Sequence, residues 1–356
     1  MIQNYNTTRN LASNIRYKND KKLDVNTNFD NSIENIKDHF YRSGLLINEN
    51  STPALFKKIA KVADKLQVPS DSINAFIYSS AEIQASCIST NQEQCVLNFS
   101  SGLINLLDEE EFSFIVGHEL GHFIYGHNHV ILKEESLETY MQKRAQEISV
   151  DRLGLIGCGD LNASVRALIK TVSGLQSKFL KFDIGQFISQ ASKISKPNLG
   201  EGISSTHPSM VIRCRALLWF STLNSFFDYP IITKREEINK IDNKIEKDFI
   251  KYVDGPQKNI IKIAKSNLIM WLIVKEIIKD KKFDNQEQNK FKKLFGINSL
   301  NKMKDFLSNI NNSKLEEIIN KKIINSKAGL EELIPISFND EFNKLSSKVI
   351  DLLKEK

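Results

Sequence analysis

His118-Glu119-Leu120-Gly121-His122 is the stretch that decides how this chain folds. Residues four apart on an α-helix lie about 40° apart around its axis and one turn along it, so both imidazoles can reach one metal ion. Glu119, beside the first histidine, is placed to take a proton from a metal-bound water. The pentapeptide therefore predicts a zinc-binding HExxH helix, and a surface helix with these letters by coincidence is the alternative.

The residues around this stretch favour a helix. Asp108 is followed three residues later by Glu111, as in a helix N-cap with a capping box, and apolar residues then recur at helical spacing. Gly117 and Gly121 are poor helix formers, but each removes a side chain next to a predicted ligand. They indicate a crowded neighbourhood, such as the close approach of a substrate or of another backbone.

A second predicted helix, residues 134–155, supplies a third candidate ligand. Glu147 and Asp151 are four residues apart on one of its faces, and a group of glycines from Gly154 onward closes it. Glu147 would complete a set of two histidines and one glutamate around Zn²⁺, leaving the fourth position to water. Asp151 would accept the other ring N–H of a ligand histidine and fix its tautomer. A solvated helix face is the alternative interpretation of these two acids.

Two further histidines follow the zinc helix. His127 lies nine residues after His118, about 180° around an ideal helix, and therefore off the ligand face. His129 lies at or beyond the predicted helix end. Both are predicted to be terminal or surface residues.

Three ordered motifs resemble those of one peptidase family. They are the zinc helix, the run Arg144-Ala145-Gln146-Glu147-Ile148-Ser149-Val150-Asp151-Arg152-Leu153-Gly154, and Thr206-His207-Pro208-Ser209 followed by Arg213. Together they are similar to the motifs of the HtpX-like and CAAX-prenyl-protease family of zinc metallopeptidases, which are gluzincins. The resemblance extends from about Thr52 to Phe227.

The resemblance implies roles for two more residues. His207 and Arg213 would steady the oxyanion or the substrate carbonyls over the metal. Occupation of the open zinc position, which would keep the enzyme latent, is a second role for His207, and a structural His-Pro turn is a third. The family further implies a metalloendopeptidase acting on peptides or unfolded proteins, in protein quality control or regulated proteolysis.

A short run of strands precedes the zinc helix. Residues 73–89 alternate as a strand would, and residues 96–99 lead into a helix at 102–107. The predicted fold is α+β, with a mostly helical zincin-type domain at residues 51–230 and a small edge sheet along which an extended peptide would add. Residues 1–50 are predicted to be a flexible arm, rich in Asn, Asp and Lys, that ends in a helix.

The composition changes at Thr233. From there the chain has 26 Lys and Arg against 19 Asp and Glu, a net charge of +7, whereas the preceding part has 23 against 24. Residues 231–356 are predicted to form an all-α domain, with Gly329 among the helix breaks. Part of this region weakly resembles the TerB-like helical domains of tellurite resistance.

The alternative function depends on this helical domain. The zinc site would then be structural or held shut, and the protein would act as a binding or chaperone-like module under stress. Glu119 argues against this alternative, because a structural site has no need of a general base. In both interpretations the domain suggests a protein partner.

Charge and hydropathy argue against a nucleic-acid-binding, membrane-spanning or secreted protein. The lysines alternate with acids rather than clustering with arginines and aromatics, which argues against nucleic-acid binding. The most apolar blocks, 216–227 and 268–274, are shorter than the ~20 residues that span a bilayer, although the family's membrane-bound members leave peripheral membrane contact open. There is no secretory signal, and the four cysteines show no paired spacing. A cytoplasmic protein with reduced cysteines is predicted.

Overall fold

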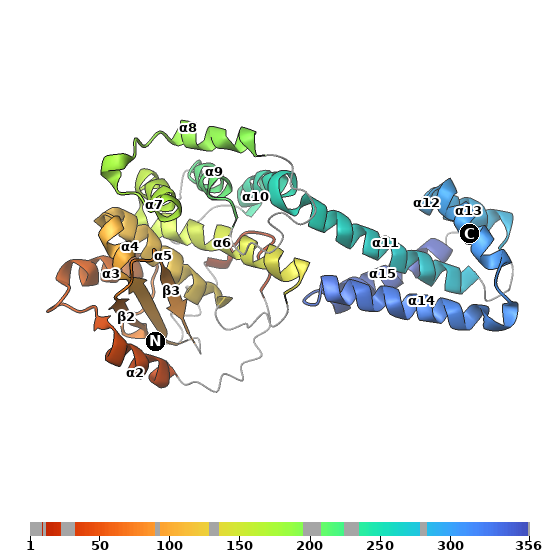
Figure 1. Cartoon of the computed structure of the whole chain (residues 1–356), viewed down its shortest axis with the longest axis horizontal. Helices are drawn as coiled ribbons and strands as arrows, with labels where there is room; N and C mark the ends of the chain where they lie inside the picture. Colours follow the sequence, from red (N-terminus) through yellow and green to blue (C-terminus); the bar gives the residue numbers. More distant parts are fainter. Residues whose placement is uncertain are drawn as a thin grey trace. The chain divides into compact units, whose positions relative to one another are not determined.

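The computed structural model describes residues 9, 12–22, 33–89, 93–127, 135–194, 208–223, 235–277 and 283–354. They form two compact units (Figure 1). The first comprises Met1–Lys133 with Tyr140–Asp254, and the second comprises Glu134–Thr139 with Gly255–Lys356. The division predicted at residue 230 differs from this one, because helix α10 (Arg235–Phe249) contributes Ile238, Ile241 and Phe249 to the core of the first unit.

The first unit contains a four-stranded sheet. Its strands are β1 (Leu45–Leu46), β2 (Ile73–Tyr78), β3 (Ala85–Ile88) and β4 (Cys95–Ser100), in the order β1-β2-β4-β3. β2 and β4 are parallel, with Phe76 opposite Asn98, and the two outer strands pair antiparallel to them. Residues 73–89, predicted to alternate as one strand, form two strands, β2 and β3, separated by residues 79–84, and β3 lies at an edge of the sheet.

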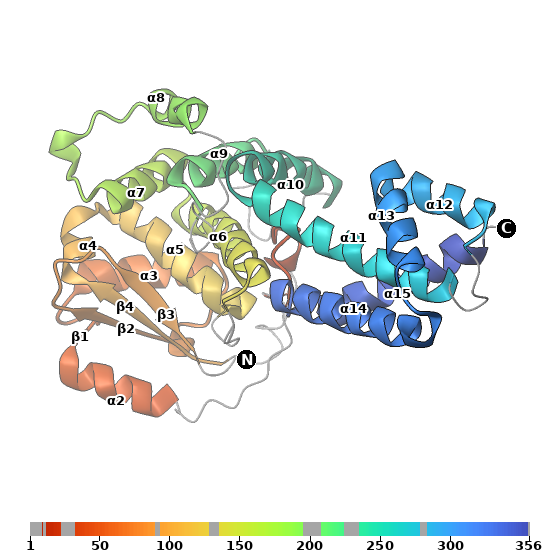
Figure 2. The ribbon, with the colours of Figure 1, turned by 45° about the vertical axis from the view of Figure 1, so that its right-hand side comes forward.

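Successive side chains of these strands point to opposite faces, and both faces are covered. Phe76 and Val96 pack with Ile33 of helix α2 (Ile33–Ser43), whereas Ala75 and Leu97 belong to the main core. Figure 2 shows α2 on one side of the sheet and helices α3 (Pro53–Lys65) and α5 (Glu109–Tyr125) on the other. The structure thus confirms the predicted α+β class, with a small sheet beside a helical layer.

Helix α5 is the central helix of that layer and is buried along most of its length. It packs against α3, β3 and α7. The other elements of the unit are α4 (Ser101–Leu106), α6 (Leu137–Cys158), α7 (Leu161–Ser173), α8 (Ile184–Ser189) and α9 (Met210–Phe220), the 3₁₀ turns Ser70–Ser72, Ser177–Phe179 and Gln190–Lys193, and the π-helical Ile250–Asp254 after α10. The predicted zinc helix is therefore held on several sides by the core.

Residues 12–20 belong to this core and are not a flexible arm. Ala12, Ile15 and Tyr17 are buried, and the Tyr17 N–H donates to Ser149 Oγ at 3.0 Å. The prediction was wrong for this segment because it rested on the high Asn and Lys content, which is typical of disorder. It gave too little weight to the three apolar residues, which pack into the core. In the rest of the predicted arm, up to residue 32, residues 9, 21 and 22 are described and the others lie outside the described residues; the helix predicted after the arm is α2.

The second unit is helical, in agreement with the sequence. It comprises α11 (Gly255–Ile277), α12 (Asn285–Phe295), α13 (Ile297–Ser308), α14 (Asn312–Leu333) and α15 (Phe338–Lys354). Its core contains Val274, Phe291, Leu300 and Ile319. Gly329 was predicted as a helix break, but α14 continues through it to Leu333. The helix continues because Leu330 and Ile334, which follow the glycine, are buried and hold this end of the helix in place.

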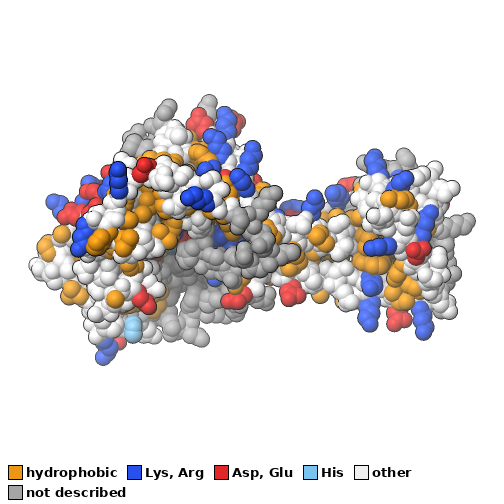
Figure 3. Space-filling model, turned by 45° about the horizontal axis from the view of Figure 1, so that its top comes forward, with side chains coloured by type: hydrophobic (Ala, Val, Ile, Leu, Met, Phe, Trp, Pro, Cys, Tyr) orange, Lys and Arg blue, Asp and Glu red, His pale blue; other side chains and the backbone are white. Residues whose placement is uncertain are grey.

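On the face shown in Figure 3, Lys and Arg side chains are spread over both units with acidic and apolar groups between them. No described helix is both long enough and apolar enough to cross a bilayer. The four cysteines, all within the described ranges, form no disulfide.

Gly329→Ala is expected to stabilise the second unit. The residue is exposed within α14, and an added Cβ would meet no described heavy atom within 4 Å. Alanine restricts the unfolded chain and favours the helix, so the free energy of unfolding should rise by about 0.5–1 kcal/mol. Chemical denaturation of the full chain followed by circular dichroism measures this change, and a loss of stability would show that position 329 needs glycine.

Candidate metal centre

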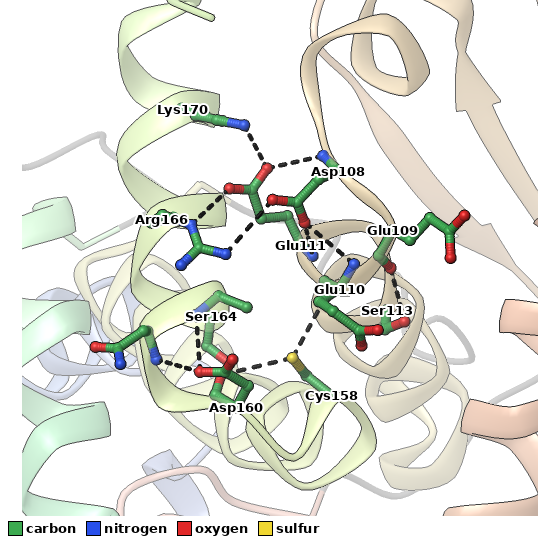
Figure 4. Close-up of polar contacts among 12 residues, drawn as sticks. Asp108, Glu109, Glu110, Glu111, Ser113, Cys158, Asp160, Ser164, Arg166 and Lys170 are labelled. Atoms are coloured by element: carbon green, nitrogen blue, oxygen red, sulfur yellow. Dashed lines mark hydrogen bonds and ion pairs between the residues drawn. The ribbon is translucent and has the colours of Figure 1, made fainter. Parts of the chain in front are cut away.

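The start of α5 is fixed by a charge network around the buried side chains of Glu111 and Lys170 (Figure 4). Asp108 caps the helix by accepting from the Glu111 N–H at 2.9 Å, and Glu111 returns a bond to the Asp108 N–H, which confirms the predicted capping box. The Glu111 carboxylate also accepts from Lys170 Nζ at 2.5 Å and from Arg166 Nε at 2.9 Å. Both cations lie on α7, so this network ties α5, the predicted zinc helix, to its neighbour.

Glycines bring α5 and α6 into backbone contact at the site. A Cβ added at Gly117 would lie 3.0 Å from Gly154 Cα, and one added at Gly121 would lie 3.0 Å from Val150 Cβ. The crowding predicted at Gly117 and Gly121 is therefore the approach of α6. This contact also corrects the predicted end of α6, which continues through Gly154 to Cys158, because glycine at this crossing serves packing rather than termination.

The three predicted ligands meet at this crossing. His118 Nε2 lies 3.7 Å from Glu147 Oε2, and His122 Nε2 lies 3.5 Å from Glu147 Oε1. One ligand atom from each residue lies within 4.8 Å of the others. Ligands at about 2.0–2.1 Å from a tetrahedral Zn²⁺ are separated by about 3.3–3.4 Å. Two imidazole nitrogens and a carboxylate at these separations fit a zinc ion with little movement.

Asp151 contacts the far side of His118. Its Oδ1 lies 3.0 Å from His118 Nδ1, as expected for an acid that accepts the second ring N–H of a ligand. Arg213 holds this carboxylate with Nε–Oδ2 and NH2–Oδ1 distances of 2.8 and 2.6 Å. The arrangement favours the His118 tautomer that leaves Nε2 free for a metal.

Arg213 is placed differently from the prediction. Its side chain is 6% exposed, and NH1 lies 3.1 Å from Glu147 Oε2 while the rest of the guanidinium contacts Asp151. A guanidinium held by two buried carboxylates beneath the ligands is not presented to a substrate carbonyl. The sequence missed this role because the pairing depends on where α9 crosses α6.

The charges of the site are strongly coupled. Burial would raise the pKa values of Glu147 and Asp151, but the Arg213 guanidinium and the neighbouring histidines outweigh it and lower both. Burial would also lower the pKa of His122, yet the Glu147 carboxylate outweighs it and raises that pKa. Both carboxyl groups are therefore ionised at neutral pH. This is the form in which Glu147 can bind a cation and Asp151 can accept the ring N–H of His118.

Glu119 follows the first ligand directly on α5. Its side chain is buried and close enough to His122 to contribute to the raised pKa of that imidazole. A carboxylate in this position can exchange protons with a group bound next to the ligands. His207, the remaining predicted site residue, lies outside the described residues.

His127 lies just past the end of α5, as predicted, but its side chain is buried and not on the surface. α5 ends at Tyr125, and Gly126 has the left-handed φ of 71°, so the chain turns back and His127 Nδ1 lies 3.1 Å from His122 Nδ1. The ideal-helix projection does not hold beyond the C-cap, so it could not predict this contact with His122. A glycine after the last apolar residue was the signal for this turn.

Asp20 joins His127 from the amino-terminal segment. Its Oδ2 lies 3.2 Å from His127 Nε2. Burial lowers the pKa of His127 to about 4, while His127 and Arg16 overcome the effect of burial and lower the pKa of Asp20 to about 2. Near neutral pH this pair therefore consists of a neutral imidazole and an ionised carboxylate.

Comparison with known proteins supports the resemblance inferred from the motifs. Residues 49–142 match the model of Peptidase family M48, which confirms the predicted relation to HtpX-like and CAAX-protease-like metallopeptidases. The matched segment contains His118, Glu119 and His122, whereas Glu147 and Asp151 lie beyond its end. No solved structure matches the chain.

Proposed function

Because residues 49–142 match Peptidase family M48, we propose that the chain is a zinc metalloendopeptidase. The observation that carries this proposal is the convergence of His118, His122 and Glu147 at zinc-binding separations, with Glu119 beside them. A site that only stabilised the fold would not need a buried carboxylate next to its ligands.

Each residue has a distinct part in the proposed hydrolysis. His118, His122 and Glu147 hold the ion, and Asp151 with Arg213 keeps His118 in its binding tautomer. When bound, Zn²⁺ would act as a Lewis acid toward a water molecule and the scissile carbonyl. Glu119 accepts a proton from the attacking water and delivers it to the leaving amine nitrogen.

The substrate is proposed to bind as an extended strand beside β3. This strand is at one end of the sheet order and packs against α5, the helix that carries the histidines. Main-chain pairing along an edge strand accepts many side-chain sequences, as a protease for peptides or unfolded proteins requires.

Cleavage of unfolded casein by the purified full chain should stop when zinc is removed. We expect 1,10-phenanthroline to abolish the release of fluorescent peptides and added Zn²⁺ to restore it, because the ion supplies the Lewis acid. The isomer 1,7-phenanthroline, which does not chelate, is the control. Zinc-loaded chain that binds casein without cutting it would instead favour the helical binding module.

A further inference from the structure

A chain of buried polar groups contacts His122 on its Nδ1 side. His122 Nδ1 lies 3.1 Å from His127 Nδ1, and His127 Nε2 lies 3.2 Å from Asp20 Oδ2. The Oδ1 atom of Asp20 accepts from Arg16 at 2.9 Å and from Gln142 at 3.1 Å. The side chains of His127 and Asp20 are 3% and 0% exposed. A predicted ligand is thus connected to a carboxylate near the amino terminus.

One arrangement of protons satisfies this chain when His122 binds a metal through Nε2. That nitrogen must offer its lone pair, so the ring proton lies on Nδ1 and is donated to His127. His127 Nδ1 is then the acceptor, which places the His127 proton on Nε2, where Asp20 accepts it. Each group fixes the tautomer of the next.

The two ligand histidines are therefore held by similar means. An aspartate that is paired with an arginine orients each ring: Asp151 with Arg213 contacts His118 directly. Asp20 with Arg16 contacts His122 through the intervening ring of His127. Such partners of ligand histidines raise their basicity and set their orientation.

The segment that carries Asp20 is anchored to the helix that carries Glu147. On α6, Ser149 Oγ accepts from the Tyr17 N–H at 3.0 Å, and Arg152 donates to the Ile15 carbonyl at 2.7 Å. The Lys18 N–H donates to Asp242 of α10 at 3.0 Å. The residues just before Asp20 are thus held by hydrogen bonds to two helices, α6 and α10.

We propose that His127 and Asp20 are positioning residues of the metal centre, and that residues 12–22 are a functional part of this centre because they supply the carboxylate. This inference rests on the proposed zinc site. It assigns to the amino-terminal segment the task of holding His122 in the tautomer that binds metal.

Zinc affinity, measured by competition with a chromophoric chelator, tests the proposal. Asp20→Ala and His127→Leu should each weaken Zn²⁺ binding about 10- to 100-fold, the usual effect of removing a partner of a ligand histidine. His127→Gln should retain most of the affinity, because its amide can accept from His122 and donate to Asp20. Asp38→Ala is the matched control: Asp38 is an exposed aspartate on α2 that accepts from Arg42 at 2.9 Å, so this variant should bind Zn²⁺ as tightly as the wild type.

A second measurement reports the tautomers directly. Nitrogen-15 NMR of histidine-labelled, zinc-loaded chain should show the His127 proton on Nε2 and the His122 proton on Nδ1, and the opposite assignment for His127 would overturn the proposal. Equal zinc affinity in wild type, Asp20→Ala and His127→Leu would also overturn it. If Asp20→Ala does not fold, the zinc affinities of His127→Leu and His127→Gln are compared instead, and equal affinities would overturn the proposal. A wild-type chain that binds no zinc would refute the proposed function itself, which is a separate result.

Discussion

Glu119→Gln is expected to reduce casein cleavage by about 10²-fold or more while leaving about one zinc ion bound per chain. The amide keeps the shape of the side chain but cannot accept the proton of the attacking water, and the three metal ligands are untouched. Fluorescent-casein hydrolysis gives the rate, and metal analysis of the same samples gives the zinc content.

Glu109→Gln is the matched control for this substitution. Glu109 lies on the same helix, nine residues before His118, but its side chain is exposed and pairs with Lys58 at 3.1 Å. It should cleave casein at the wild-type rate. Full activity in Glu119→Gln would show that another group is the base, whereas loss of zinc in that variant would make Glu119 part of the binding set.

Arg213→Leu is expected to lower the free energy of unfolding of the metal-free chain by about 3–5 kcal/mol. The substitution leaves Asp151 and Glu147 as buried carboxylates without their guanidinium, and breaking a buried ion pair from one side has this cost. Urea denaturation in the presence of a chelator measures the loss. Added Zn²⁺ should recover part of it, because the ion supplies positive charge beside Glu147.

Arg42→Leu provides the comparison at an exposed ion pair. Arg42 pairs with Asp38 on α2 and the two side chains are 77% and 61% exposed, so its removal should leave the free energy of unfolding nearly unchanged. If Arg213→Leu keeps its stability and loses only kcat, the structural assignment is wrong and the oxyanion role inferred from the family returns.

Local sequence signals predicted the parts of the site that lie within single helices. The spacing of His118 and His122 on α5, and of Glu147 and Asp151 on α6, puts each pair on one face whatever the tertiary structure. The capping box at Asp108 likewise depends on four consecutive residues. These predictions agree with the structure because helix geometry alone determines them.

Contacts between distant segments could not be predicted in this way. Arg213 meets Asp151 only because α9 crosses α6, and Asp20 reaches His127 only because residues 12–20 bury three apolar side chains. The position of His127 depends on the backbone reversal at Gly126. In each case the contact depends on how segments distant in the sequence pack together. Neither composition nor projection onto an ideal helix gives that information.

The backbone contact between α5 and α6 determines how the site responds to change elsewhere. Gly117 faces Gly154 at the crossing, so the two helices that carry the ligands are already at their minimum separation. Smaller side chains in the surrounding core therefore cannot bring the two helices closer at this crossing. A methyl group at either glycine, by contrast, acts as a spacer that moves both histidines away from Glu147. The backbone contact at this crossing therefore sets how far apart the two helices with the predicted ligands lie.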